Sequence, residues 1–295
     1  MSETKFKPTG ALKKFLKVDK TTRVLSSVER HFIAKPKADD RRQDVIHPSE
    51  MVSDTWCHRA QYFKLIGAVP AVPKDRGVNL KKRLIFEEGH AIHRKWQEVF
   101  YECGTLYGKW LCTRCNASMV GLSPAECITC GKNDKIVYKE VSLNYAPYKI
   151  AGHADGILVG YESPLLLEIK SIGQGTFVWE DPEYAKLHDH DLFRMWADLD
   201  KPFMKHINQA QMYMKLCELM ELEIQPQEAC FIYELKANQE YKEFIVPKSD
   251  FSIGHLLEAA KMISEAVDNK TPPKCNMGGA QWCGECGGYN DQPAG

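Results

Sequence analysis

The stretch that most constrains the fold runs from residue 149 to residue 171, KIAGHADGILVGYESPLLLEIKS. It contains two apolar runs, at residues 157–159 and 165–169, separated by the turn sequence Gly-Tyr-Glu-Ser-Pro. Apolar runs of this length around a turn that contains Gly and Pro predict an antiparallel β-hairpin. The second run carries large apolar residues on both of its faces, so we expect this strand to be covered on both sides.

The hairpin would oppose acids and possible cations across its two strands. Opposed residues of an antiparallel pair share a constant index sum, so a turn centred on residues 161 and 162 places Asp155 opposite Glu168. The same register places His153 opposite Lys170, and the period of two puts all four side chains on one face. Most hairpin charges are solvated cross-strand pairs. In a strand covered on both sides, however, an unpaired carboxylate is costly, which favours a bound cation.

The residue types around this position suit a hard divalent cation. The carboxylates of Asp155 and Glu168 and the backbone carbonyl of Ile169 offer the oxygen ligands that Mg²⁺ or Mn²⁺ prefers. Lys170, two residues beyond the second acid, can hold a water molecule or a phosphate oxygen. An Asp followed by Glu-x-Lys therefore indicates a site for phosphodiester cleavage.

This combination resembles the core motif of the PD-(D/E)XK nuclease superfamily, and more narrowly that of its RecB-like exonuclease branch. Ala154 stands where the superfamily motif has proline. The resemblance implies that Asp155, Glu168 and the carbonyl of Ile169 bind divalent ions and that Lys170 orients the attacking water. It also implies cleavage of DNA by a two-metal mechanism.

Two predicted helices extend the resemblance on either side of the hairpin. Residues 81–103 have the spacing of an amphipathic helix that aims His93 inward, and residues 205–221 predict a helix with Gln209 and Tyr213 on one face. By itself, an inward histidine is more often a hydrogen-bonded core residue, and Tyr213 fits the core of its helix. The RecB-like branch is similar in having Gly-x-x-x-His and Gln-x-x-x-Tyr at these places. The resemblance implies that His93 is a metal ligand and that Gln209 and Tyr213 assist at the phosphate.

Four cysteines between the first of these helices and the hairpin form two closely spaced pairs. Each pair has the form Cys-x-x-Cys, and the pairs are separated by eleven residues: Cys112, Cys115, Cys127 and Cys130. Two such knuckles predict a tetrahedral zinc site, because each tight turn supplies two thiolates. We expect an inserted zinc ribbon over residues 109–132, with a structural role.

A second group of cysteines lies near the end of the chain. Cys275, Cys283 and Cys286 leave a four-ligand site one ligand short, and Cys57 is a plausible fourth, although a helical cysteine is by itself most often core filler. This arrangement resembles the iron-sulfur subgroup of the RecB-like branch, the CRISPR-associated RecB-like exonucleases and the AddB nuclease domain. The resemblance implies a 4Fe-4S cluster. Zinc stays open as the alternative metal.

The remaining elements are predicted from periodicity and from turn signals. We expect helices over residues 22–33, 49–67, with Cys57 inside, and 251–269. A strand is expected over residues 137–145, and two more over residues 228–237 and 240–247.

Composition and charge bear on compartment and partners. The 295-residue chain is 44% hydrophobic, enough for one large domain with a full core. It has no run of about 18 apolar residues and no apolar signal-peptide core near its start, so we expect a cytoplasmic protein, of a bacterium or phage-infected cell, without a membrane partner. The formal net charge is zero, but residues 1–42 hold twelve Lys/Arg against five Asp/Glu. Such a basic arm suits phosphate backbones, and a solubilising tail is the equal alternative.

Together these features predict an α/β fold, a restriction-endonuclease-like mixed central sheet flanked by helices with an inserted zinc ribbon. We expect a basic arm over residues 1–46, a RecB-like nuclease domain over residues 47–288 and a tail over residues 289–295. The predicted function is that of a metal-dependent DNA exonuclease acting on single strands or DNA ends in replication, recombination or repair, with a helicase, recombinase or replication protein as partner. A nucleic-acid-binding or assembly subunit with a nuclease fold, and a DNA endonuclease, are the alternatives.

Overall fold

The computed structural model describes residues 23–34, 41–69, 80–133, 135–279 and 283–289. The chain divides into two compact units, residues 1–39 with 75–85, and residues 40–74 with 86–295. In the first unit, helix α2 (Arg23–Ala34) forms where the sequence predicted a helix. Most of the basic arm before and after α2, up to residue 40, and the tail beyond residue 289 lie outside the described residues.

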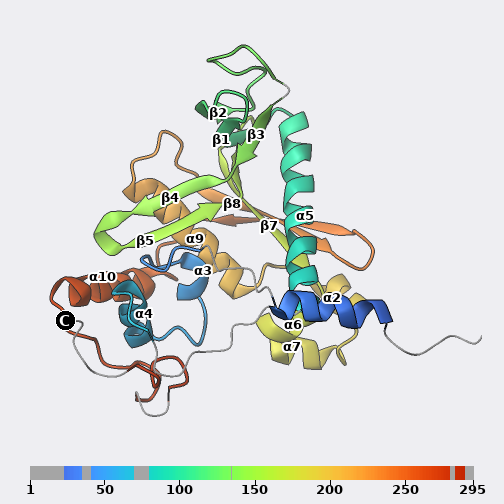
Figure 1. Ribbon diagram of the computed structural model, residues 1–295. Coiled ribbons are helices and arrows are strands. Elements are labelled where there is room, and N and C mark those ends of the chain that lie inside the picture. Colours follow the sequence, from blue (N-terminus) through green and yellow to red (C-terminus); the bar gives the residue numbers. More distant parts are fainter. Residues whose placement is uncertain (1–22, 35–40, 70–79, 134, 280–282, 290–295) are drawn as a thin grey trace, which may run out of the picture. The chain divides into compact units, whose positions relative to one another are not determined.

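A mixed sheet of seven strands forms the centre of the second unit (Figure 1). Its order is β2-β1-β6-β7-β8-β9, and β3 also pairs with β1. The pair β7–β8 is parallel, and the other pairs are antiparallel. The strands are β1 (Leu106–Cys112), β2 (Ser118–Leu122), β3 (Ile136–Lys139), β6 (Gly156–Leu158), β7 (Leu165–Ile172), β8 (Glu228–Leu235) and β9 (Tyr241–Pro247). The predicted α/β fold with a mixed central sheet is confirmed.

The register predicted for the hairpin is present between β6 and β7. Gly156 pairs with Leu167 and Leu158 pairs with Leu165, which is the expected index sum. The prediction that His153 lies opposite Lys170 is wrong. His153 belongs to β5 (Ile150–Ala154), which leaves the main sheet and pairs with β4 (Val141–Tyr145) in a second, two-stranded sheet. The chain therefore changes sheets at Asp155, between β5 and β6.

Helices cover the two faces of the central sheet. On one face, Leu167 and Ile169 of β7 pack in a cluster with residues of α5 (Leu80–Glu102). On the other face, Leu166 packs with α9 (Met204–Leu219) and α10 (Gly254–Asp268). As expected from its sequence, β7 is thus covered on both sides, and its even-numbered residues face α9.

The helix predicted over residues 49–67 is two short helices, α3 (Pro48–Met51) and α4 (His58–Leu65). Cys57 lies outside the helix interior, since it is the N-cap of α4 and its Sγ accepts a hydrogen bond from the amide of Ala60 at 3.5 Å. The other short elements are η1 (Ala146–Tyr148), α6 (Gln174–Glu180), α7 (Pro182–Leu187) and α8 (Leu192–Asp198). None of the helices in the described ranges is long and apolar enough to cross a membrane.

The predicted ribbon region is continuous with the main sheet. Strands β2 and β3 both pair with β1, and β1 also pairs with β6 through residues 106 and 107. The ribbon therefore extends the sheet, and the strand order shows that β1 connects it to the hairpin that carries Asp155.

Candidate functional site

Asp155 is the centre of the site and is held from four directions. Its carbonyl oxygen accepts hydrogen bonds from Nε2 of Gln97 in α5, at 3.1 Å, and from the hydroxyl of Tyr138 in β3, at 3.0 Å. Its Oδ2 accepts a hydrogen bond from the backbone amide of Ile169 in β7, at 2.6 Å. Its Oδ1 lies 3.0 Å from Nδ1 of His93 in α5. The buried carboxylate is therefore fixed in position by the sheet and by α5.

A third ligand-type residue lies beside His93 and Asp155. Ligand atoms of His93, Glu140 and Asp155 all lie within 4.8 Å of one another, a spacing that suits one metal ion. Burial lowers the pKa of His93, but the hydrogen bond and charge of Asp155 outweigh it, so the pKa of His93 is raised. Burial and the charge of Asp155 also raise the pKa of Glu140. The His93 shift reflects the neighbouring negative charge of Asp155, whereas the Glu140 shift comes first from burial; a bound cation would stabilise both carboxylates in their charged form.

Glu140 was missed in the sequence because residues 137–145 were predicted to form one strand. The structure breaks this strand at Glu140, which lies between β3 and β4 in two different sheets. The burial alternation changes phase there: the more buried residues are Ile136 and Tyr138 before the break but Val141 and Leu143 after it, and because Val137 is apolar too, the sequence hid the change. Such a change of phase in the alternation marks the end of a strand.

Glu168 and Lys170 form an ion pair on the side of β7 that faces α9. Lys170 Nζ lies 2.8 Å from Glu168 Oε2, and the Glu168 side chain is only 2% exposed. Burial raises the pKa of Glu168 to about 7 against the opposing charge of Lys170. Burial lowers the pKa of Lys170, but Glu168 and Asp155 raise it more, so Lys170 remains a cation.

Gln209 and Tyr213 continue this network from α9. Lys170 Nζ donates to Gln209 Oε1 at 3.3 Å, and Gln209 Nε2 donates to the Tyr213 hydroxyl at 3.0 Å. Tyr213 is buried where β5 passes it, and a Cβ added at Gly152 would lie 2.8 Å from its ring. Glycine is thus required for the close approach of β5 to Tyr213.

The donor set fits a divalent ion of the Mg²⁺ or Mn²⁺ type. Carboxylate oxygens from Asp155 and Glu140 and one imidazole nitrogen converge, and Glu168 lies close enough to Asp155 for their charges to interact. Of the predicted ligands, the structure brings His93 and Asp155 together, adds Glu140, and pairs Glu168 with Lys170. Ile169 is buried in β7, and its amide holds Asp155.

Two hollows lie beside this group. The first, which we call the ribbon hollow, has a volume of about 600 Å³ and is lined by residues that include Gln97, Lys109, Tyr138, Lys139, Glu140 and His153. The second, the tyrosine hollow, has a volume of about 430 Å³ and is lined by residues that include Arg41, Arg42, His47, Gly152 and Tyr213. Ser142 and His153 line both hollows, so the two adjoin along β4 and β5.

The four ribbon cysteines converge as predicted from their spacing. Sγ of Cys112 lies 3.7 Å from that of Cys130, and Sγ of Cys115 lies 3.6 Å from that of Cys127. Four thiolates at about 2.3 Å from one zinc ion in a tetrahedron are about 3.8 Å apart, so the donor set fits zinc. Backbone amides of residues 130 and 129 lower the pKa of Cys127 to about 6, whereas burial and the neighbouring thiols raise the pKa of Cys115 and Cys130, so of these three Cys127 alone is biased toward the thiolate before a metal binds.

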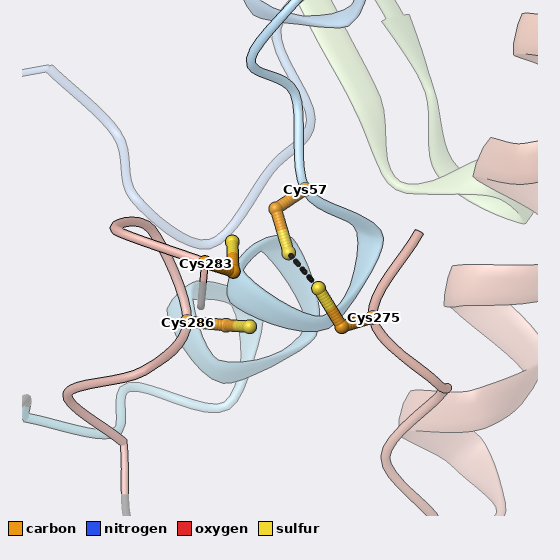
Figure 2. A group of neighbouring side chains, drawn as sticks. All are labelled: Cys57, Cys275, Cys283 and Cys286. Atoms are coloured by element: carbon orange, nitrogen blue, oxygen red, sulfur yellow. Dashed lines mark hydrogen bonds between the residues drawn. The ribbon is translucent and has the colours of Figure 1, made fainter. Parts of the chain in front are cut away.

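The second cysteine group also converges, across the length of the second unit. Figure 2 shows Cys57 at the start of α4 pointing toward Cys275, Cys283 and Cys286 of the C-terminal segment. All four sulfurs lie within 4.8 Å of one another, and those of Cys57 and Cys275 are 3.9 Å apart. This spacing matches one tetrahedral ion. Four convergent thiolates also suit the 4Fe-4S cluster that the resemblance implied, so the choice between that cluster and zinc stays a prediction.

Comparisons with known proteins found structural likenesses only. No family model matches the sequence, and the search of curated proteins found no match. The structure is similar to that of LHK-Exo, an alkaline exonuclease from Laribacter hongkongensis, in complex with dAMP. The two chains are 13% identical with a TM-score of 0.42, and the match covers 77% of this chain and 90% of LHK-Exo. SSO0001 is similar at 14% identity and a TM-score of 0.34, covering 92% of this chain and 93% of SSO0001.

Proposed function

We propose that this protein is a divalent-metal-dependent nuclease that hydrolyses phosphodiester bonds of DNA, most simply from a strand end. One observation carries the proposal: Asp155 and Glu168 are held as buried acids on adjoining segments, and the half-buried Lys170, paired with Glu168, bonds Gln209 of α9. Buried acids of this kind reduce stability unless a cation compensates them. Their retention is understandable if they bind the ions of a phosphodiesterase site.

The ligands divide into two sets around Asp155. His93 and Glu140 cluster with the Asp155 carboxylate, and Glu168 and Ile169 belong to β7, whose Ile169 amide binds Asp155 Oδ2. Bound divalent ions would supply a Lewis acid for the phosphate and a water of lowered pKa. Gln97, Tyr138 and the Ile169 amide keep the Asp155 backbone and carboxylate oriented for this role.

Lys170, Gln209 and Tyr213 act on the phosphate side of the site. Lys170 is a cation whose amine can hold an attacking water or a nonbridging phosphate oxygen. Gln209 accepts one of its hydrogen bonds and thereby limits where the amine points. Burial raises the pKa of Tyr213, so its hydroxyl stays neutral and can anchor Gln209 throughout the reaction.

The choice of an exonuclease rests on the resemblance to the RecB-like branch, which the order of His93, Asp155, Glu168 and Gln209 in the chain supports. A DNA endonuclease would use the same chemistry. A binding or assembly subunit would not need the complete set of buried polar groups, which cost stability when they serve no substrate.

Incubation with Mn²⁺ and two DNA substrates tests the proposal. An end-labelled linear single strand should be degraded while a circular single strand of the same sequence survives. Asp155→Asn should reduce the rate about 1,000-fold or more, because a metal ligand contributes several kcal/mol to the barrier. Glu258→Gln, the same type of change at an exposed position of α10, is the matched control. Cutting of circles would identify an endonuclease, and binding without cleavage by the wild type would refute the nuclease.

A further inference from the structure

Two lysines face each other across the ribbon strands. Lys109 of β1 and Lys139 of β3 are direct partners in the antiparallel register, and both side chains are exposed. Directly opposed residues on one face have Cβ atoms about 4.5–5.5 Å apart, and like charges at this spacing destabilise a strand pair. A pair of this kind weakens the sheet unless an anion lies between the two ammonium groups.

The surrounding acids do not compensate these charges. Among the residues that the structure describes, neither lysine forms an ion pair, whereas Lys95 and Lys170 both do. Glu140 follows Lys139 directly, but its carboxylate belongs to the cluster with His93 and Asp155. The two positive charges are thus available to an anionic ligand.

The lysine pair also lies in the right place to meet a substrate of the metal site. Lys109 and Lys139 line the ribbon hollow together with Glu140, so the hollow joins the two lysines to the candidate metal ligands. Tyr138, also in its lining, donates a hydrogen bond to the carbonyl of Asp155. Through His153 the ribbon hollow adjoins the tyrosine hollow, which Tyr213 lines. A chain that follows both hollows passes the proposed catalytic residues on its way.

We infer that Lys109 and Lys139 form a phosphate subsite that holds the backbone of a DNA strand beside the metal centre. The inference rests on the proposed function and assigns a substrate-binding role to the strands of the ribbon. Each ammonium group is a point charge with three donors, which suits a backbone phosphate without reading its base. One ribbon cysteine, Cys112, ends β1 three residues after Lys109 and pairs with Ile136 of β3, so a bound metal would hold the lysine pair in register.

Binding without catalytic metal tests the subsite directly. A single-stranded oligonucleotide without terminal phosphates is titrated with zinc-loaded protein in the presence of Ca²⁺ or without a divalent ion, so that cleavage does not occur. Lys109→Ala and Lys139→Ala should each raise Kd about 5-fold to 10-fold. The slope of log K against log salt should become shallower by about 0.7 for each phosphate that the variant no longer neutralises. Lys261→Ala, at an exposed position of α10, is the matched control and should leave both quantities unchanged.

A charge reversal separates binding from fold stability. Lys109→Glu creates an opposite-charge pair with Lys139, so Tm should stay the same or rise while oligonucleotide binding falls by more than 10-fold. A purely structural lysine pair would change Tm without changing Kd, and that result would overturn the inference. Equal Kd values for wild type and both alanine variants would overturn it as well.

Two further outcomes separate the subsite from the proposed function and from recognition of strand ends. If the wild type binds DNA but does not cleave it, and the lysine variants bind more weakly, the subsite stands and the nuclease proposal fails. If the lysine variants lose affinity only for strands that carry a 5′ or 3′ terminal phosphate, the pair reads an end, and the backbone subsite is wrong. Absence of any DNA binding by the wild type also refutes it.

Discussion

The cysteine group at Cys57, Cys275, Cys283 and Cys286 should contribute more to global stability than the ribbon cysteines. A metal bound at this group would tie α4 to the C-terminal segment. Three hydrogen bonds between described residues also join the two segments. The Asn276 side chain accepts one from the amide of His58 and donates one to the carbonyl of Trp56, and Arg59 donates one to the carbonyl of Pro273. One ring contact adds to these, since Tyr289 stacks on Phe63 with 4.8 Å between the ring centroids. Because such contacts are individually weak, we expect Cys283→Ser to remove most of the link between the two segments.

The magnitude follows from the length of chain that each metal closes. Cys57 and Cys275 are 218 residues apart, whereas Cys112 and Cys130 are 18 residues apart. Treated as covalent cross-links, loops of these lengths restrict the unfolded chain by about 5 kcal/mol and about 3 kcal/mol, respectively. Against a typical stability of about 5–15 kcal/mol, the first is a large fraction. Cys283→Ser should therefore lower the free energy of unfolding by about 2 kcal/mol more than Cys112→Ser does.

Urea denaturation of protein purified without oxygen, followed by far-UV circular dichroism, measures this difference. Cys103→Ser is the matched control, because Cys103 is exposed and belongs to neither group. Limited proteolysis should cut Cys112→Ser within the ribbon, and it should cut Cys283→Ser throughout the second unit. The reasoning is refuted if Cys283→Ser is as stable as Cys103→Ser, or if Cys112→Ser is the less stable of the two metal-site variants.

Four other predictions concern the metal centre, pH, metal content and the basic arm. Glu140→Gln should slow DNA cleavage about 10-fold to 100-fold, with partial recovery at higher Mn²⁺, because His93 and Asp155 still hold an ion. Burial and the charge of Lys170 lower the pKa of His206 well below 6.5. Below pH 6.5 the unfolded chain therefore binds a proton that the folded chain does not, and the free energy of unfolding should fall by about 1.4 kcal/mol per pH unit. The fall should be smaller in His206→Asn. Metal analysis of protein purified without oxygen should find about one zinc, about four irons and acid-labile sulfide per chain. Deleting residues 1–42, which carry seven surplus positive charges, should weaken DNA binding and flatten its salt dependence.

Each of these has an outcome that contradicts it. Full activity of Glu140→Gln at low Mn²⁺ would remove that residue from the metal centre. Equal pH slopes for the wild type and His206→Asn would show that His206 does not titrate on unfolding. Two zinc ions and no sulfide in protein never exposed to oxygen would refute the iron-sulfur cluster. An unchanged salt slope after deletion would make the arm a tail without contact to DNA.

Local patterns were enough to predict some parts of the site. The turn at residues 160–164 and the period of two determine the β6–β7 register, because a slip by one residue would move every side chain to the other face. Gln209 and Tyr213 share a helical face at a spacing of four residues, and the hydrogen bond between them follows from that spacing. Within each Cys-x-x-Cys pair the two thiols also lie close together because only two residues separate them. In each case the partners are near in sequence or belong to one regular element.

Other parts were decided only when distant segments met. The chain leaves one sheet for the other at Asp155 because β5 pairs with β4, and this pairing separates His153 from Lys170. Glu140 lies beside His93 and Asp155 because β3 pairs with β1 and β4 does not. The opposition of Lys109 and Lys139 has the same origin, since strand partners far apart in sequence are selected by packing of whole sheets, which no local pattern records. Residue spacing within one element thus determined which side chains share a face, and the pairing of strands decided which of those side chains come into contact.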